Sequence, residues 1–209
     1  MNLRLLLISH APTAAMRAGR FPADDPLDAR GLADAQAAQA AQARLSHLSH
    51  LAAFNEAPAF VSPAACARDT ASALGLNAKV DAALADIDYG NWTGRRLADL
   101  AAQTPIDLTA WMHDPDAAPH GGESFSQAVK RIGEWLDTLD VALHDAQGKA
   151  SGNARDVIAV THAAIIRAAV IHALSASPAI FPRIEIAPLT VVELHRSEQR
   201  GWTWWPASS

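Results

Sequence analysis

The chain has 209 residues and a mass of 22.1 kDa, a size typical of one domain or of a domain with a small insertion. Half of the residues are hydrophobic, which excludes wholesale disorder, and the net charge of −5 comes without any Lys/Arg-rich run, so no nucleic-acid partner is expected. The single cysteine, Cys66, excludes a disulfide framework and a multi-cysteine zinc site. The apolar run that ends at Ser9 is too short for a membrane helix, so we expect a soluble, cytoplasmic protein with no membrane partner.

The predicted elements alternate between strands and helices along the chain. The opening apolar run predicts a buried strand, and the proline-containing loop 11–30 argues against one regular helix there. Ser62 is predicted to cap a helix that runs to Gly75, with Pro63 at its first position. The remaining expectations are a helix over 31–53, a short strand over 57–61, an extended piece at 78–80, a helix over 95–104, an excursion at about 105–122, an amphipathic helix over 124–147, a strand over 157–160, an apolar helix to about 175 and a closing hairpin from 191–195 and 202–205.

This alternation predicts a three-layer α/β/α sandwich with a mostly parallel central sheet. The chain has no internal repeat and no flexible linker, so we expect residues 1–209 to form a single domain. The cluster of Trp202, Trp204 and Trp205 is consistent with a closing strand that packs one aromatic face inward, or with a self-association patch. A homodimer is therefore left open.

Two histidines occupy matching positions in the pattern. Ser9-His10 follows the first predicted strand, and Thr161-His162 follows the strand at 157–160. Ligands collect at the carboxyl edge of a parallel sheet, where loops open and helix N-termini point. Each histidine alone could simply cap its strand, but two of them in matching contexts favour a site.

The surrounding motifs resemble those of the histidine phosphatase superfamily, in its phosphoglycerate-mutase-like branch near the α-ribazole phosphatases. The segment Ser9 to Thr13 is similar to the Arg-His-Gly signature that continues to a Thr, with Ser9 in place of the arginine. Taking one extra residue or so after Ser62, Arg68 matches the arginine of a Ser-x-x-x-Arg-x-x-Gln-Thr-Ala stretch. Three further segments are similar to family motifs: 84–94 to a Leu-x-Glu-x-x-x-Gly-x-Trp-x-Gly loop, 121–124 to a Gly-Glu-Ser helix start, and 157–167 to the final strand, histidine and helix.

The resemblance implies a metal-independent phosphomonoesterase that acts on a small phosphorylated substrate and needs no cofactor. It assigns the nucleophile that becomes phosphohistidine to His10, and the carboxyl that protonates the leaving alkoxide to Asp86, where the family has Glu. His162 and Arg68 would hold phosphate oxygens, with Ser9 and Thr13 as further hydrogen-bonding groups. Cys66 is interpreted as a small packed residue.

Replacement of the signature arginine by Ser9 removes a charged donor, a loss worth about 2–4 kcal/mol of transition-state stabilisation. Arg20, or Arg17, is a candidate to supply the missing charge, although for both the interpretation as a solvated loop residue is favoured. The alternative function is a catalytically weak or inactive relative that binds a phosphorylated ligand or acts as a regulatory protein. A mutase is disfavoured because the chain lacks room for long insertions, and the excursion at 105–122 argues against a minimal protein-phosphohistidine phosphatase.

Overall fold

The computed structural model describes residues 2–45, 57–146 and 154–205. The strands are β1 (Asn2–Ser9), β2 (Ala59–Val61), β3 (Ala78–Val80), β4 (Ala154–Thr161), β5 (Val191–Ser197) and β6 (Gly201–Trp205). The helices are α1 (Ala14–Arg17), α2 (Ala29–Leu45), α3 (Ala65–Ala73), α4 (Leu97–Gln103), α5 (Pro105–His113), α6 (Phe125–Ala146) and α7 (Ala163–Ala173), with 3₁₀ turns η2 (Ala82–Leu84), η3 (Gly90–Trp92) and η4 (Pro178–Arg183). Within the described ranges, no helix has the length and apolar character needed to cross a membrane.

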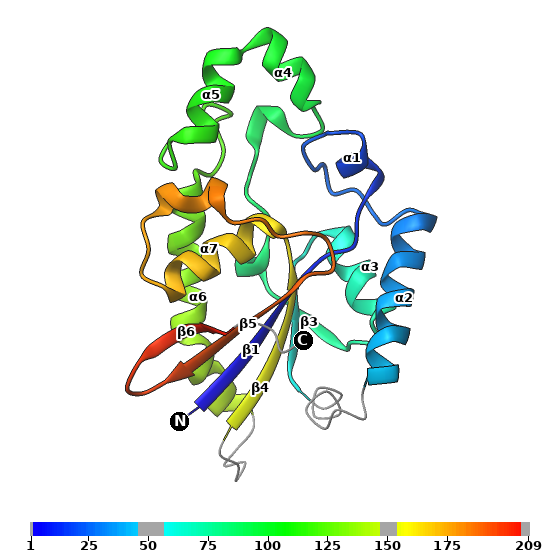
Figure 1. The fold of residues 1–209 in the computed structure, drawn as a ribbon, viewed down its shortest axis with the longest axis vertical. Coiled ribbons are helices and arrows are strands. Elements are labelled where there is room, and N and C mark those ends of the chain that lie inside the picture. Colours follow the sequence, from blue (N-terminus) through cyan, green and yellow to red (C-terminus); the bar gives the residue numbers. More distant parts are fainter. Residues whose placement is uncertain (1, 46–56, 147–153, 206–209) are drawn as a thin grey trace.

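The strands form one sheet in the order β3-β2-β4-β1-β5-β6 (Figure 1). The pairs β3–β2, β2–β4 and β4–β1 are parallel, whereas the C-terminal hairpin adds β5 antiparallel to β1 and β6 antiparallel to β5. The mostly parallel sheet and the closing hairpin predicted from the sequence are confirmed. In the hairpin, Trp202 is buried and both Trp204 and Trp205 are 52% exposed.

The side chains of β1 alternate between two hydrophobic layers, as the two-residue period of a strand requires. Leu5 and Leu7 belong to the core that α6 and α7 cover, whereas Leu6 and Ile8 pack with α3 on the opposite face. Helix α2 packs on the outside of α3, so helices lie on both sides of the sheet (Figure 1). Because both faces are covered, β1 reads as a continuous apolar run in the sequence.

Two local expectations differ from the structure, and a third is tested only in part. The helix after Ser62 begins only at Ala65, and Ser62 Oγ accepts a hydrogen bond from Ala64 N at 3.2 Å instead of capping the helix. The excursion at 105–122 contains helix α5, which starts at Pro105. The helix predicted over 31–53 is seen as α2 up to Leu45, and residues 46–53 lie outside the described residues.

Helices α4 and α5 stand beyond the carboxyl ends of β1 and β4 (Figure 1). They carry a small core of their own, in which Leu100 and Leu108 pack with Phe21 and Trp92. An antiparallel bridge from Arg20 to Arg96 joins the loop after β1 to the start of α4. The bridge and this small core connect α4 and α5 to the segments next to the edge of the sheet where the two histidines lie.

Candidate active site

The two predicted histidines lie side by side at the carboxyl edge of the sheet. Strands β1 and β4 are adjacent and parallel, and their last residues, Ser9 and Thr161, are paired. His10 follows Ser9 and His162 follows Thr161, so the two histidines leave the sheet at the same level. Their ring centroids are 5.0 Å apart at an interplanar angle of 67°. Both side chains are buried, with His162 only 3% exposed.

His10 has one ring nitrogen fixed by the backbone and the other available. Its Nδ1 lies 2.8 Å from the carbonyl oxygen of Ala11, a partner that accepts only, so Nδ1 carries the proton and Nε2 keeps its lone pair. Ala11 N in turn donates to Thr70 Oγ1 at 3.0 Å, which fixes this stretch of backbone on α3. Burial, and next the neighbouring His162, lower the pKa of His10. The ring is therefore a neutral imidazole suited to nucleophilic attack.

His162 connects the hydroxyl of Ser62 to the carboxyl of Asp86. Its Nε2 lies 2.8 Å from Ser62 Oγ, and its Nδ1 lies 3.3 Å from Asp86 Oδ2 with no aligned hydrogen-bond partner. The other carboxylate oxygen of Asp86 accepts from Ile87 N at 2.9 Å. A proton held between His162 and Asp86 would be well placed to reach a leaving group.

The loop that carries Asp86 is held by hydrogen bonds from α6 and β4. Arg131 on α6 donates through Nη1 to the carbonyl oxygens of Ala83 and Ala85, at 2.6 and 3.1 Å. The hydroxyl of Thr161 on β4 donates to the carbonyl oxygen of Leu84 at 2.7 Å. These contacts fix the position of Asp86 relative to His162.

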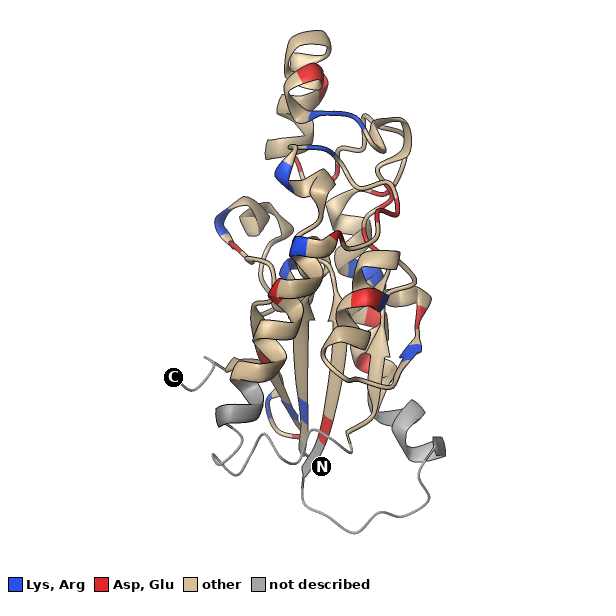
Figure 2. Ribbon diagram, turned by 90° about the vertical axis from the view of Figure 1, so that its right-hand side faces the viewer, with Lys and Arg blue, Asp and Glu red and all other residues tan. Residues whose placement is uncertain are grey.

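A cavity of about 540 Å³ opens over these groups, with His10, Thr13, Cys66, Asp86 and His162 in its lining. Its charged lining residues are Asp24, Asp25, Asp86, Asp88, Arg20 and Arg167, so carboxylates outnumber guanidinium groups. Figure 2 shows that basic and acidic residues are interspersed along the part of the chain that the structure describes. The cavity is therefore less cationic than a phosphate site that holds several arginines.

Arg167 is the cation built most deeply into the cavity. It lies on α7, five positions after His162, and its Nε is buried without a hydrogen-bond partner in the described structure. A buried N–H of this kind is costly unless a ligand oxygen accepts from it. Arg167 was not among the predicted site residues, although its place in the first turns of the helix after His162 was a usable signal.

The structure does not bring Arg68 to this cavity: the side chain is exposed and is not part of the lining. Cys66 lies there instead, on the inner face of α3 and 5% exposed. Counted without a gap from Ser62, the Ser-x-x-x-Arg-x-x-Gln-Thr-Ala pattern places its arginine at Cys66 and its Thr at Thr70. The match to Arg68 needs two extra residues after Ser62, and it moves the arginine by two positions, more than half a helical turn, to the outer face of the helix.

The remaining predicted residues divide between the cavity and its surroundings. Thr13 lines the cavity and caps α1, its Oγ1 accepting from Met16 N. Arg20 lines the cavity while Nη1 donates to Gly94 O at 3.0 Å, whereas Arg17 is paired with Asp28. Ser9 is buried at the end of β1 and is not part of the lining.

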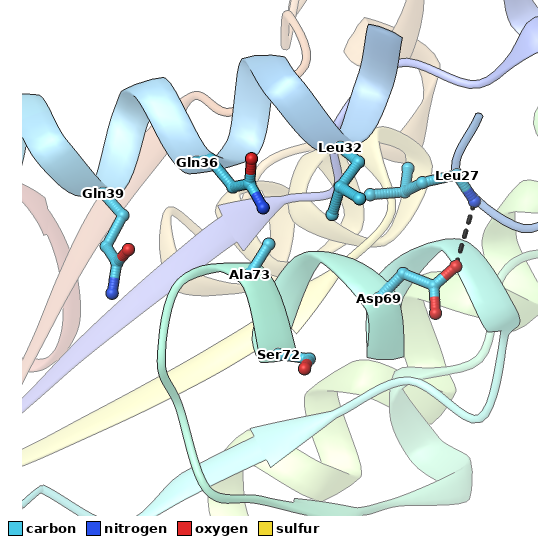
Figure 3. Close-up of a pocket in the computed structure, with 7 residues that line it drawn as sticks. All are labelled: Leu27, Leu32, Gln36, Gln39, Asp69, Ser72 and Ala73. Carbon is cyan, nitrogen blue, oxygen red and sulfur yellow. Dashed lines mark hydrogen bonds between the residues drawn. The ribbon is translucent and has the colours of Figure 1, made fainter. Parts of the chain in front are cut away.

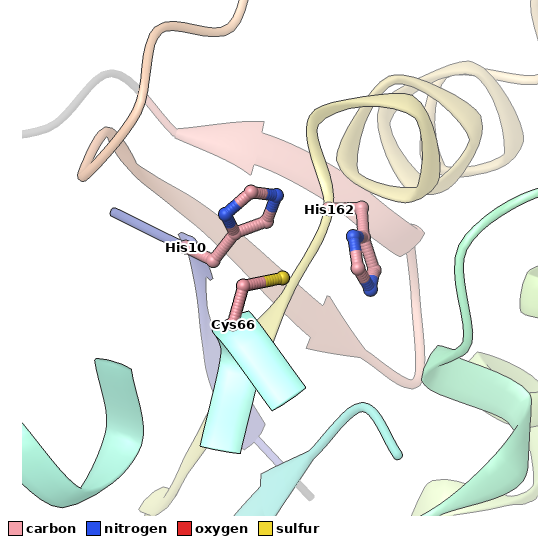
Figure 4. Close-up of side chains that lie close together, drawn as sticks. All are labelled: His10, Cys66 and His162. Atoms are coloured by element: carbon pink, nitrogen blue, oxygen red, sulfur yellow. The ribbon is translucent and has the colours of Figure 1, made fainter. Parts of the chain in front are cut away.

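Cys66 forms a cluster with the two histidines. One ligand atom from each of His10, Cys66 and His162 lies within 4.8 Å of the others, a grouping that could hold a metal ion. Figure 4 shows the thiol pointing from α3 into the space beside both imidazole rings. Burial, and next the charge of Asp86, raise the pKa of Cys66 to about 12, so the free thiol is protonated and unreactive at neutral pH.

A second hollow, of about 690 Å³, lies between α2 and α3 (Figure 3). Its one ionisable lining residue, Asp69, already accepts a hydrogen bond from Leu27 N at 3.0 Å. The rest of the lining is Leu27, Leu32, Gln36, Gln39, Ser72 and Ala73. It therefore lacks the converging titratable groups of the histidine cavity.

A match to a known protein family identifies the superfamily of this chain. The histidine phosphatase superfamily (branch 1) matches residues 5–205. The chain belongs to this superfamily. In the two motifs quoted from the sequence, the arginine positions fall at Ser9 and Cys66.

The similar proteins include phosphatases. Glucosyl-3-phosphoglycerate phosphatase from Mycobacterium tuberculosis is 36% identical over 106 residues, which are 49% of this chain and 47% of that protein. The bifunctional protein Rv2228c from the same species is 30% identical over 140 residues; these are 64% of this chain but only 36% of that protein. The chain thus matches about a third to a half of the length of these curated relatives.

Solved structures support the same fold. The native structure of mycobacterial glucosyl-3-phosphoglycerate phosphatase has a TM-score of 0.80 at 26% identity and covers 100% of both chains. A putative α-ribazole-5′-P phosphatase from Escherichia coli has a TM-score of 0.78 at 20% identity, covering 99% of this chain and 96% of that one. At that identity, the second likeness shows the fold alone.

Proposed function

We propose that the protein is a phosphomonoesterase that hydrolyses a small phosphorylated metabolite through a phosphohistidine at His10. The observation that carries this proposal is the hydrogen bond from His10 Nδ1 to Ala11 O, which leaves the Nε2 lone pair free in the cavity. Membership of the superfamily and the phosphatases among the relatives support it. A structure of the mycobacterial phosphatase with inorganic phosphate, 26% identical and with a TM-score of 0.76, gives the fold a phosphate-binding precedent.

The proposed reaction has two steps. His10 Nε2 attacks phosphorus in line, an N–P bond forms and the P–O bond to the leaving group breaks. The leaving alkoxide takes the proton held between His162 and Asp86, whose nearest atoms are 3.3 Å apart. Water then cleaves the phosphohistidine, which releases inorganic phosphate and returns a proton to the pair.

This site has few positively charged side chains to stabilise the negative charge of the phosphoryl-transfer transition state. The cavity has four Asp side chains against Arg20 and Arg167, and neither Ser9 nor Cys66 supplies the guanidinium that the family motifs carry. Each missing charged donor costs about 2–4 kcal/mol, or roughly 10²–10³-fold in rate. We therefore propose Arg167, through its unpartnered Nε, as the main phosphate-binding cation, with Arg20 as the second.

The direct test is hydrolysis of p-nitrophenyl phosphate and of glucosyl-3-phosphoglycerate by the full chain in EDTA. The expected result is slow turnover that falls to the uncatalysed rate in His10→Ala. His113→Ala is the matched control, because His113 is exposed on α5 and lies outside the cavity lining. Turnover that survives in His10→Ala would sink the proposal.

The alternative, an inactive relative that binds a phosphorylated ligand, is favoured by one observation: both motif arginines are replaced by neutral residues, Ser9 and Cys66. It predicts no turnover of any phosphomonoester by the native chain, together with saturable binding of inorganic phosphate that Arg167→Ala abolishes. Turnover lost in His10→Ala excludes it.

A further inference from the structure

Three groups of the kind that transition metals prefer meet in a buried part of the cavity. The ligand atoms of His10, Cys66 and His162 lie within 4.8 Å of one another, and all three residues are buried. Imidazole nitrogen and thiolate sulfur are the ligands of Zn²⁺, at about 2.0–2.3 Å, which puts tetrahedral ligands about 3.3–3.8 Å apart. Small side-chain rotations that move the ligand atoms by about 1 Å would bring their separations from the present 4.8 Å or less to that tetrahedral spacing.

The two imidazoles are oriented as metal-bound histidines are. In each ring one nitrogen is held by a protein oxygen: His10 Nδ1 by Ala11 O and His162 Nε2 by Ser62 Oγ, both at 2.8 Å. Such outer contacts fix the ring and its tautomer while the other nitrogen binds the metal. The nitrogens left over are His10 Nε2 and His162 Nδ1, and the latter is buried without a hydrogen-bond partner.

The charge of the cavity also favours a cation. Asp86 Oδ2 lies 3.3 Å from His162 Nδ1, so two hydrogen-bond acceptors, each with a lone pair, face each other when that nitrogen is unprotonated. The lining as a whole has more carboxylates than guanidinium groups. A divalent ion would supply the positive charge that Ser9 and Cys66 do not.

We propose that His10, Cys66 and His162 bind a Zn²⁺-class metal ion, and that the bound metal blocks phosphoryl transfer by occupying His10 Nε2. Binding replaces the S–H bond of Cys66 with a metal–sulfur bond, and both the thiol proton and the proton held between His162 Nδ1 and Asp86 are released to solvent. Three protein ligands leave one coordination position open to the cavity. The blocking effect rests on the proposed function, whereas the metal site does not.

The site is tested by titrating the full chain with Zn²⁺ against a chromophoric chelator, without phosphate, and by recording the absorption spectrum with Co²⁺. We expect one Zn²⁺ per chain with a Kd below about 1 µM, and a near-ultraviolet thiolate-to-Co²⁺ band with intense tetrahedral d–d bands. In Cys66→Ser, affinity should fall by more than about 100-fold, since the loss of a group behind a ligand alone costs about 10–100-fold. Cys66→Ala, checked for folding by circular dichroism, is the second variant, and His113→Ala is the control.

Zn²⁺ affinity that is unchanged in both folded cysteine variants, or a Co²⁺ spectrum without the thiolate band, would overturn the site. The blocking effect is read separately, from phosphatase activity in EDTA and after Zn²⁺ is added back. Zn²⁺ inhibition in the native chain, absent in Cys66→Ser relative to its own metal-free rate, supports it. Activation by Zn²⁺ of a chain that is inactive in EDTA would keep the metal site but contradict both blocking and the phosphohistidine route.

Discussion

Position 66 decides the chemical character of the cavity. Cys66 points into it from the inner face of α3, at the place where the family motif carries an arginine, and Arg68 on the outer face does not substitute for it. The same position thus removes a phosphate-binding charge and brings a sulfur beside His10 and His162. One substitution should shift the site between anion and cation binding.

The variant Cys66→Arg should raise kcat/KM for p-nitrophenyl phosphate by up to about 10²–10³-fold, because it adds a charged donor for the transferring phosphoryl group. It should also abolish Zn²⁺ binding. The cavity of about 540 Å³ has room for the guanidinium. Arg68→Ala, measured in parallel, should leave kcat/KM unchanged. A folded Cys66→Arg enzyme with no gain in activity would show that charge at this position does not limit the reaction.

The loop between η2 and η3 packs closely against the backbone of the segment before α6. A Cβ at Gly122 would clash with the carbonyl oxygen of Asp88, so the segment before α6 lies directly against this loop. Glu123 N donates to the same carbonyl at 2.8 Å. Asp86, two residues before Asp88, takes its position from this contact and from Arg131 on α6.

Gly122→Ala should therefore destabilise the protein by about 1–3 kcal/mol, as overpacking against backbone does, and lower the Tm by about 2–4 °C for each kcal/mol. Activity should fall as well, because the loop that carries Asp86 must move. Gly121→Ala is the comparison: the nearest atom to its added Cβ is Asn91 Nδ2 at 3.9 Å, so only the strain of its φ of +77° remains. Equal Tm losses in the two variants would contradict this account of the loop.

Over the whole molecule, the fold followed from the sequence more readily than the site. We could predict β1, β4 and the closing hairpin because a buried strand shows as a local run of apolar or alternating residues in the sequence. The pairing of His10 with His162 also followed, since both end neighbouring parallel strands. Cys66 and Arg167 did not, because which face of a helix meets the cavity depends on register: two positions separate a lining residue from the exposed Arg68.

The proposed phosphatase activity depends above all on His10 as the nucleophile that accepts the phosphoryl group. The most direct test is to mix the native chain in EDTA with a phosphomonoester and to quench the reaction rapidly during turnover. The peptides are then analysed by mass spectrometry under alkaline conditions, where phosphohistidine survives. We expect a phosphoryl group on His10 during turnover, absent in His10→Ala and retained in His113→Ala. Turnover without any phosphorylated histidine, or with the phosphoryl group on His162, would contradict it.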